Sequence, residues 1–169
     1  MIYCDTSFLL ALYVERDFFH VQASRLAAKF KEPIPLTLLS ELELVNGIRR
    51  SLAAKIIPIE EHDAIFRQIA EDEFQGILVR HAIHQADHFA KARELSKRFT
   101  PEISARSLDI LHVAAALLLK AIDFGSFDEK QRILAGKVAG QSPFQQKLKQ
   151  PLFLKRTSLL TRLAIWYPW

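Results

Sequence analysis

The chain alternates between short apolar runs and longer segments in which apolar residues recur every three or four positions. Residues 1–4 form the first apolar run, which leads into Asp5, and residues 8–14 form a second. This order predicts a short strand followed at once by a helix, since an unbroken apolar run is typical of a strand buried in a parallel sheet. Ligands of open α/β sheets bind outside the carboxyl ends of the strands, where Asp5 stands. The alternative is that Asp5 or Thr6 only caps the following helix.

The rest of the chain continues this alternation of strand and helix patterns. Helical spacing predicts helices over residues 18–31, 37–51, 60–74, 87–99 and 128–135, and a strongly apolar helix that begins at a Ser104 or Ser107 cap and ends at Lys120. Short apolar or proline-biased segments predict strands over residues 33–36, 77–83 and 122–127. We expect Pro101 to stop the helix before it. The alternation predicts a βαβ architecture with a parallel sheet.

Composition and charge narrow the class of protein. Half of the 169 residues are hydrophobic and a quarter are charged, which is typical of one globular domain. The single cysteine, Cys4, excludes an internal disulfide and fits a reducing cytoplasm. No signal peptide or membrane-spanning run is predicted, so we expect no stable membrane insertion. Residues 130–169 contain eight Lys and Arg and no Asp or Glu, so the net charge of +4 conceals a body of charge −4.

Two further acids stand where strands end or helices begin. Asp109 lies near the start of the strongly apolar helix, where an unpaired carboxylate is costly and where Arg106 is a possible partner. Asp128 follows the predicted strand at residues 122–127, with Ser126 beside it. The alternatives are an ordinary first-turn aspartate for Asp109 and an N-cap with a capping box to Gln131 for Asp128. His112, on the same helix as Asp109, is interpreted as a core histidine.

The helix predicted at residues 37–51 offers a fourth acid, either Glu41 or Glu43. Glu43 and Asn46 are three residues apart, so Asn46 is placed to orient that carboxylate. Glu41 falls among apolar residues on a helical wheel, which also suggests burial. Ser40 and Glu43 have the spacing of a capping box. Spacing alone leaves the two glutamates undecided.

Taken together, the acids indicate a property that none of them indicates alone. Three or four carboxylates in one pocket repel each other, and some stay protonated unless a cation compensates their charge. Hard oxygen ligands of this kind suit Mg²⁺ or Mn²⁺. Such ions activate water and stabilise charge on a phosphoryl group, so the pattern indicates phosphodiester hydrolysis.

Four segments of the chain resemble the PIN-domain family, and most closely its VapC-type toxin ribonucleases. They are residues 2–9, 42–48, 106–116 and 126–135, in an order and spacing that cover roughly residues 1–141. The resemblance implies an α/β, three-layer fold with a central parallel sheet flanked by helices. It also implies that Asp5, Glu43, Asp109 and Asp128 hold Mg²⁺ or Mn²⁺, which chooses Glu43 over Glu41. Thr6, Ser126 and Asn46 are then supporting residues.

The resemblance also implies an activity and partners. We expect a metal-dependent endoribonuclease, the toxin of a toxin–antitoxin pair, that acts on RNA in the cytoplasm. A cognate antitoxin protein and a homodimer are the expected protein partners. Because the body is negative, a rim of Arg49, Arg50 and Arg106 is expected to attract the RNA. The alternatives are a PIN nuclease for RNA processing without an antitoxin, and a non-catalytic PIN-like binding module.

The last 28 residues depart from the family pattern. Residues 142–169 mix basic and apolar side chains, and the PIN domain is predicted to end at residue 141. One interpretation is an amphipathic basic segment that binds RNA, a membrane surface or a partner. The other, which we favour, is an extension with no role in the fold.

Overall fold

The structure, a computed structural model, describes residues 1–140, and the predicted extension at 142–169 lies outside them. The strands are β1 (Ile2–Cys4), β2 (Ile34–Leu36), β3 (Leu78–Arg80) and β4 (Asp123–Gly125). The helices are α1 (Thr6–Tyr13), α2 (His20–Ala27), α3 (Leu38–Ala53), α4 (Ile59–Phe74), α5 (Gln85–Ile103), α6 (Ser107–Leu118) and α7 (Glu129–Ala139). No helix within residues 1–140 is long and apolar enough to cross a bilayer.

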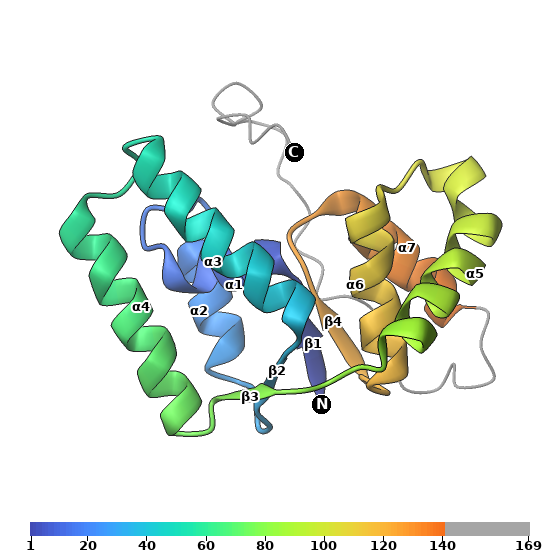
Figure 1. The fold of residues 1–169 in the computed structure, drawn as a ribbon, viewed down its shortest axis with the longest axis horizontal. Helices are drawn as coiled ribbons and strands as arrows, with labels where there is room; N and C mark the ends of the chain where they lie inside the picture. The colour runs from blue at the N-terminus through green and yellow to red at the C-terminus, as the bar shows by residue number, and fades with distance from the viewer. Residues whose placement is uncertain (141–169) are drawn as a thin grey trace.

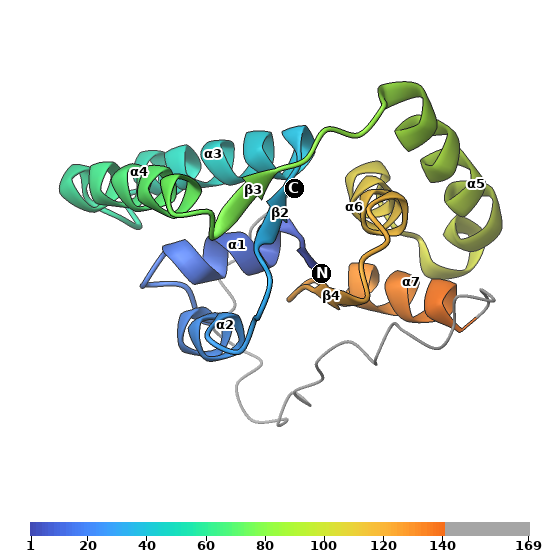
Figure 2. The same cartoon turned by 90° about the horizontal axis from the view of Figure 1, so that it is seen from below.

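The short strands run through the middle of the molecule, and the helices cover them from two sides. β1 pairs with β4, and β2 pairs with β3, both in parallel. Helices α1 to α4 lie on one side of the strands and α5 to α7 on the other (Figures 1 and 2). The prediction of an α/β fold with parallel strands between layers of helices is therefore confirmed.

β1 joins the two halves of the core. Ile2 and Cys4 pack into the apolar cluster formed with α1 to α4, whereas Tyr3 packs into the cluster formed with α5 to α7. This alternation follows from the pleat, which sends successive side chains of a strand to opposite faces. Both faces of the strand are covered, so all three side chains are apolar or aromatic, and the ladder continues to Asp5, whose N–H donates to Gly125 O.

Helix caps account for several boundaries. Asp5 caps α1 by accepting from Phe8 N–H, and Asp128 caps α7 by accepting from Gln131 N–H. The predicted capping box between Ser40 and Glu43 is wrong. Thr37 caps α3 instead, in a reciprocal pair with Ser40, because the helix begins at residue 38 and Ser40 is its third residue.

The start of α6 and the end of α5 also differ from prediction. α5 continues past Pro101 to Ile103, whose side chain packs against the apolar cluster formed with α5 to α7. Ser104 then ends α5 in the left-handed conformation, with φ of 54°, and its N–H donates to Thr100 O. Neither predicted serine caps α6. Its N-cap is Arg106, whose N–H is accepted by the side chain of Asp109.

Several elements are shorter than predicted, among them the strand predicted at residues 122–127, of which only β4 (Asp123–Gly125) is formed. The segment at residues 18–31 is helical only over α2, because turns precede it and follow it. The strand predicted at residues 77–83 pairs only over β3, where Leu78 lies opposite Ile34 and Arg80 opposite Leu36. The length of β3 therefore matches that of its partner β2, which is also only three residues long.

A close contact between α1 and α3 fixes the distance between their polar ends. A Cβ on Gly47 of α3 would lie 2.8 Å from two methyl carbons of Leu10 of α1. Only glycine allows the helices to approach so closely without displacing Leu10. The same pair of helices brings Thr6 and Glu43 into hydrogen-bond contact.

Gly47→Ala and Gly136→Ala should have opposite effects on stability. Both glycines are in helix interiors, where alanine is favoured by roughly 0.5–1 kcal/mol. A Cβ on Gly136 meets nothing within 4 Å, so that variant should be stabilised. Gly47→Ala should be destabilised on balance, since overpacking costs about 1–3 kcal/mol. Urea denaturation measures both, and an equal gain for the two variants would contradict the close packing.

Candidate active site

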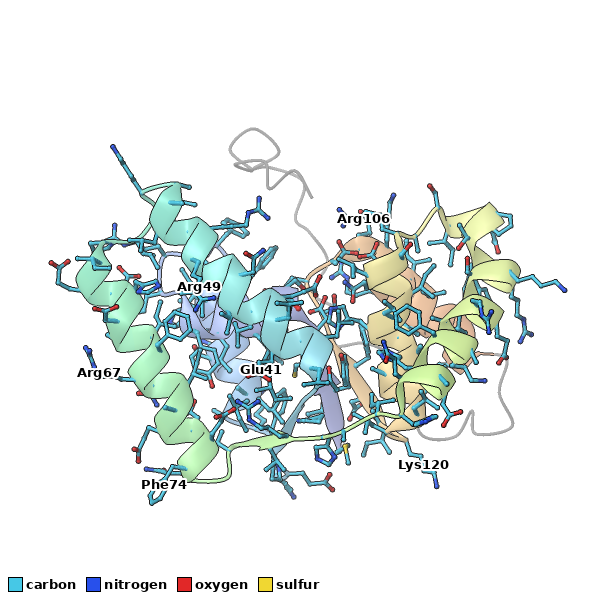
Figure 3. All side chains as sticks on the ribbon, viewed as in Figure 1. Glu41, Arg49, Arg67, Phe74, Arg106 and Lys120 are labelled. Carbon is cyan, nitrogen blue, oxygen red and sulfur yellow. The ribbon has the colours of Figure 1, made fainter. Side chains whose placement is uncertain are left out.

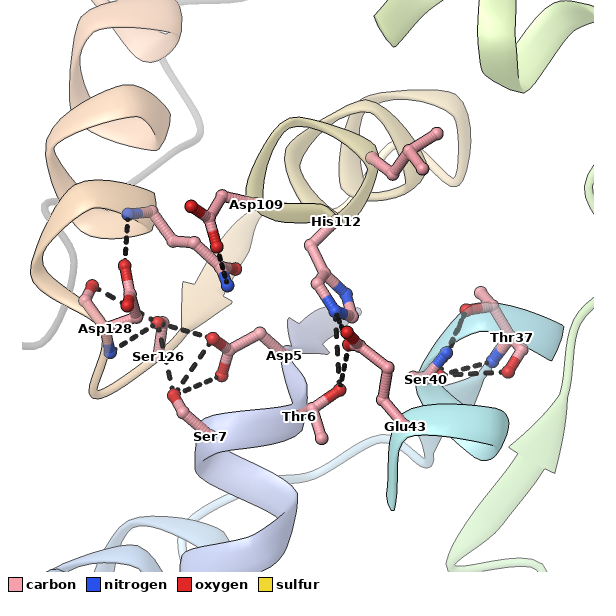
Figure 4. Close-up of polar contacts among 12 residues, drawn as sticks. Asp5, Thr6, Ser7, Thr37, Ser40, Glu43, Asp109, His112, Ser126 and Asp128 are labelled. Carbon is pink, nitrogen blue, oxygen red and sulfur yellow. Dashed lines mark hydrogen bonds and ion pairs between the residues drawn. The ribbon is translucent and has the colours of Figure 1, made fainter. Parts of the chain in front are cut away.

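The four predicted acids come from four separate elements and lie at one end of the strands. Asp5 follows β1, Asp128 follows β4 and caps α7, Asp109 is in the first turn of α6, and Glu43 is on α3 (Figure 4). A cavity of about 380 Å³ lies here, and its lining includes Glu43, Asp109 and Asp128. Asp5 lies beneath, fully buried.

Neutral donors hold the Asp5 carboxylate. Ser7 Oγ lies 2.7 Å and 2.9 Å from its two oxygens, Ser126 Oγ donates to Oδ2 at 2.7 Å, and Phe8 N–H donates to Oδ1 at 2.9 Å. Burial raises the pKa of Asp5 to about 6, although these hydrogen bonds and the proximity of His112 lower it in part. Asp5 is therefore both a helix cap and a carboxylate whose charge is poorly compensated.

Arg106 and Gln131 link Asp109 to Asp128. The Arg106 guanidinium lies 3.2 Å from Asp109 Oδ2 and 3.6 Å from Asp128 Oδ2, and its own side chain is about half exposed. The Gln131 side chain, which would have completed the predicted capping box, instead points its amide at Asp109 Oδ1, 3.3 Å away. The pairing of Arg106 with Asp109, considered from the sequence, is therefore present and extends to Asp128.

Glu43 is held by Thr6 and His112. The Thr6 hydroxyl donates to Glu43 Oε2 at 2.7 Å, and His112 Nε2 lies 2.5 Å from the same oxygen (Figure 4). Burial alone would raise the pKa of Glu43, but the hydrogen bonds from His112 and Thr6 lower it below its ordinary value. His112 is buried, as expected of a core histidine, and its Nδ1 bonds to the Tyr3 hydroxyl at 2.8 Å.

The structure places the other residues of α3 outside this cluster. Glu41 pairs with Arg80 on the molecular surface, so its predicted burial is wrong. Asn46 is exposed, and the observed partners of Glu43 are Thr6 and His112. Arg49 is also exposed, with its guanidinium 5.8 Å from the Phe66 ring (Figure 3). The helix therefore directs only one of its two glutamates into the cavity.

Three residues of the site were not anticipated from the sequence. Ser7 contacts both oxygens of Asp5 and also accepts from Phe127 N–H, which ties α1 to the end of β4. Its position two residues after Asp5 is a signal that could have been used. His112 and Gln131 act across distances of 69 and 22 residues, so no local pattern shows their roles.

The donor set fits a hard divalent cation by its chemistry. Carboxylates and hydroxyls from four elements surround one cavity, and these are the ligands that Mg²⁺ and Mn²⁺ prefer. Within residues 1–140, however, no three Asp, Glu, His or Cys side chains are arranged to hold an ion together. Arg106 and His112 engage three of the four carboxylates instead, so binding of a cation requires some of these side chains to turn.

A second, larger cavity of about 740 Å³ lies between α1, α2 and α4. None of the four predicted acids lines it. Its polar lining includes Asp72, which accepts a hydrogen bond from Tyr13 and another from Gln68. The smaller cavity is therefore identified by its chemistry and not by its size.

Comparison with known proteins identifies the family. The PIN domain family model matches residues 2–137. A crystal structure of Mycobacterium tuberculosis VapC20, described as a toxin that cleaves the sarcin–ricin loop, superposes with a TM-score of 0.61. The alignment has 18% sequence identity and covers 79% of this chain and 94% of that one, which supports the fold. No match was found among the curated proteins.

The stability of the protein without divalent ions should depend on pH through Asp5. Its pKa is about 6 when folded and 3.8 without the fold, so the folded state holds more protons between these values. The contribution of Asp5 to the free energy of unfolding is therefore fully present below pH 4. It is lost as the pH rises through 6, and the loss amounts to at most about 3 kcal/mol. Asp5→Asn should be less stable than the parent at pH 4 and should gain relative to it toward pH 7.

Chemical denaturation in a chelating buffer at pH 4 to 7 measures this difference. Asp123→Asn is a matched control, because Asp123 lies at the opposite end of β4. A constant difference between the parent and Asp5→Asn across the range would mean that Asp5 acts only as a helix cap.

Proposed function

We propose that this chain, which belongs to the PIN domain family, is a metal-dependent endoribonuclease of the VapC type, the toxin of a toxin–antitoxin pair. The observation that carries the proposal is the gathering of Asp5, Glu43, Asp109 and Asp128 from four elements around one end of the strands (Figure 4). Its resemblance in fold to a VapC toxin supports the same reading. The reaction is hydrolysis of RNA phosphodiester bonds.

In this proposal the four acids hold Mg²⁺ or Mn²⁺, which supplies an activated water and stabilises charge on the phosphoryl group. Ser7 and Ser126 orient the Asp5 carboxylate, and Thr6 orients Glu43. Each hydroxyl donates a hydrogen bond to a carboxylate oxygen, and these bonds fix the orientation of the two carboxylates. The buried position of Asp5 keeps water from its oxygens and strengthens its attraction to a cation.

The RNA is proposed to approach over the basic rim. Arg106 lines the cavity, and Arg49 lies on α3 (Figure 3). Arg50 is the next residue of the same helix. A guanidinium that contacts Asp109 and Asp128 from a half-exposed position can also reach a phosphate at the mouth. Sequence-specific recognition of RNA mostly targets unpaired bases in loops and bulges, so RNA of this class is the proposed substrate. VapC20 is described as a toxin that cleaves the sarcin–ricin loop.

The proposed partners follow from the same family. A cognate antitoxin would neutralise the nuclease in the cytoplasm, and the active form would be a homodimer. Two exposed leucines, Leu38 and Leu42, lie one turn apart on α3 and form an apolar strip that a second copy can cover. The domain is proposed to end at residue 141, with residues 142–169 outside it.

Removal of any one acid should abolish most of the RNA cleavage. Asp5→Asn, Glu43→Gln, Asp109→Asn and Asp128→Asn should each slow cleavage of a sarcin–ricin loop hairpin in Mg²⁺ by about 100-fold or more, since metal stabilisation of charge is worth several kcal/mol. Glu41→Gln is the matched control on the same helix and should cleave like the parent. The assignment fails if Asp5→Asn and Asp109→Asn both cleave as fast as the parent.

Leu42→Glu should convert the homodimer to a monomer. A charge in an apolar interface leaves the carboxylate desolvated and unpaired, which disfavours association. Sedimentation of the parent and the variant measures the mass directly. Phe74→Glu is the control, because Phe74 is also a large exposed apolar residue but lies at the end of α4 (Figure 3). A parent that is monomeric, or a dimer that Leu42→Glu leaves intact, would reject this interface.

A further inference from the structure

His112 is the buried residue that connects the proposed acids to the core. It lies on α6, with 1% of its surface exposed, and no motif of the chain assigns it a role. Its ring reaches three other elements: Tyr3 on β1 through Nδ1, and Glu43 on α3 and Thr6 on α1 through Nε2. Any buried imidazole needs hydrogen-bond partners, but here the partners of Nε2 are a proposed site acid and the hydroxyl that also holds that acid.

The ring is held rigidly on the side away from Glu43. Tyr3 is fully buried, its hydroxyl lies 2.8 Å from His112 Nδ1, and its ring stacks on Phe124 of β4 with centroids 5.8 Å apart. Burial raises the pKa of Tyr3 far above its usual range, so the hydroxyl stays protonated and available for this hydrogen bond. The orientation of the imidazole is thus fixed by the paired strands β1 and β4.

Glu43 needs such a partner more than the other acids do. Its side chain has more rotatable bonds than an aspartate, and restricting a glutamate costs up to about 2 kcal/mol of rotamer entropy. It also comes from α3, on the other side of the strands from α6 (Figure 2). Because a carboxylate only accepts, Nε2 of His112 carries the proton in the 2.5 Å hydrogen bond to Glu43 Oε2.

We propose that His112 is a positioning residue that holds the Glu43 carboxylate in the cavity, with Tyr3 fixing the imidazole. The inference rests on the proposed function, in which Glu43 is a metal ligand. His112 touches neither metal nor RNA and acts through Glu43. Partners of this kind, which orient the ligands of a metal, change metal affinity by about 10- to 100-fold when they are removed.

Two amides at position 112 separate positioning from packing. In His112→Gln the amide nitrogen falls near the place of Nε2 and can still donate to Glu43. In His112→Asn it reaches only the place of Nδ1, toward Tyr3. Calorimetric titration with Mn²⁺ alone should show affinity lowered by about 10- to 100-fold in His112→Asn, with most of it restored in His112→Gln. Thermal unfolding measures how much each of the two variants loses in stability.

A double-mutant cycle tests that the effect passes through Glu43. Glu43→Gln should itself weaken Mn²⁺ binding, and His112→Asn should then weaken it no further, because there is no carboxylate left to position. Tyr3→Phe should follow the same rule with a smaller loss, and it carries the test alone if His112→Asn does not fold. RNA cleavage should fall in parallel with Mn²⁺ affinity.

The outcomes distinguish this inference from the function on which it rests. Suppose that the parent binds Mn²⁺ and that Glu43→Gln weakens this binding. If His112→Asn and His112→Gln then bind Mn²⁺ with the same affinity as each other, the positioning role is rejected and the proposed function stands. An equal loss from His112→Asn with and without Glu43 would also reject it, as a purely structural effect. A parent that binds no Mn²⁺ would overturn both proposals together.

Discussion

Repulsion among carboxylates is the constraint on which this structure depends. Four acids are brought to one end of a small set of strands, and each would lose solvation there without a compensating partner. The protein meets the constraint with donors from its own chain. Arg106 lies between Asp109 and Asp128, His112 and Thr6 hold Glu43, and the hydroxyls of Ser7 and Ser126 hold Asp5. Parallel pairing of β1 with β4 makes this possible, because it places Asp5 and Ser126 side by side.

Helix capping and the proposed chemistry were alternatives in the sequence, but the fold makes them compatible. Asp5 and Asp128 both cap helices with one carboxylate oxygen, and Asp109 accepts the backbone N–H of Arg106 at the start of α6. A helix N-terminus favours an anion and orients it, so a capping carboxylate is already held in place for the role proposed here. The remaining oxygens face the hydroxyls, Arg106 and the cavity.

The sequence predicts those parts of the fold that depend on local periodicity. The strong apolar runs around Asp5 and Asp109 give β1, α1 and α6 with only small errors at their ends, and the family match confirms the fold. Boundaries that depend on tertiary partners are missed, as at Pro101, where packing of α5 carries the helix one turn further. Asp5, Asp109 and Asp128 could be nominated because each stands at a strand end or a helix start, whereas Glu43, inside α3, was chosen over Glu41 only by the family resemblance. Asn46 and Glu41 were misplaced because helical spacing gives neighbours on a helix but not which face meets the core.

The kinds of donor around each acid indicate how the site would respond to a cation. Glu43 is paired with an imidazole, and Asp109 and Asp128 share a guanidinium, so these three have partners able to carry positive charge. Asp5 has only hydroxyls and one backbone N–H as direct partners among residues 1–140, which orient a carboxylate without neutralising it. This difference explains why burial raises the pKa of Asp5 to about 6 while that of Glu43 is lowered. An entering cation would therefore gain most from Asp5, and the half-exposed Arg106 would be the partner freest to turn away toward a phosphate.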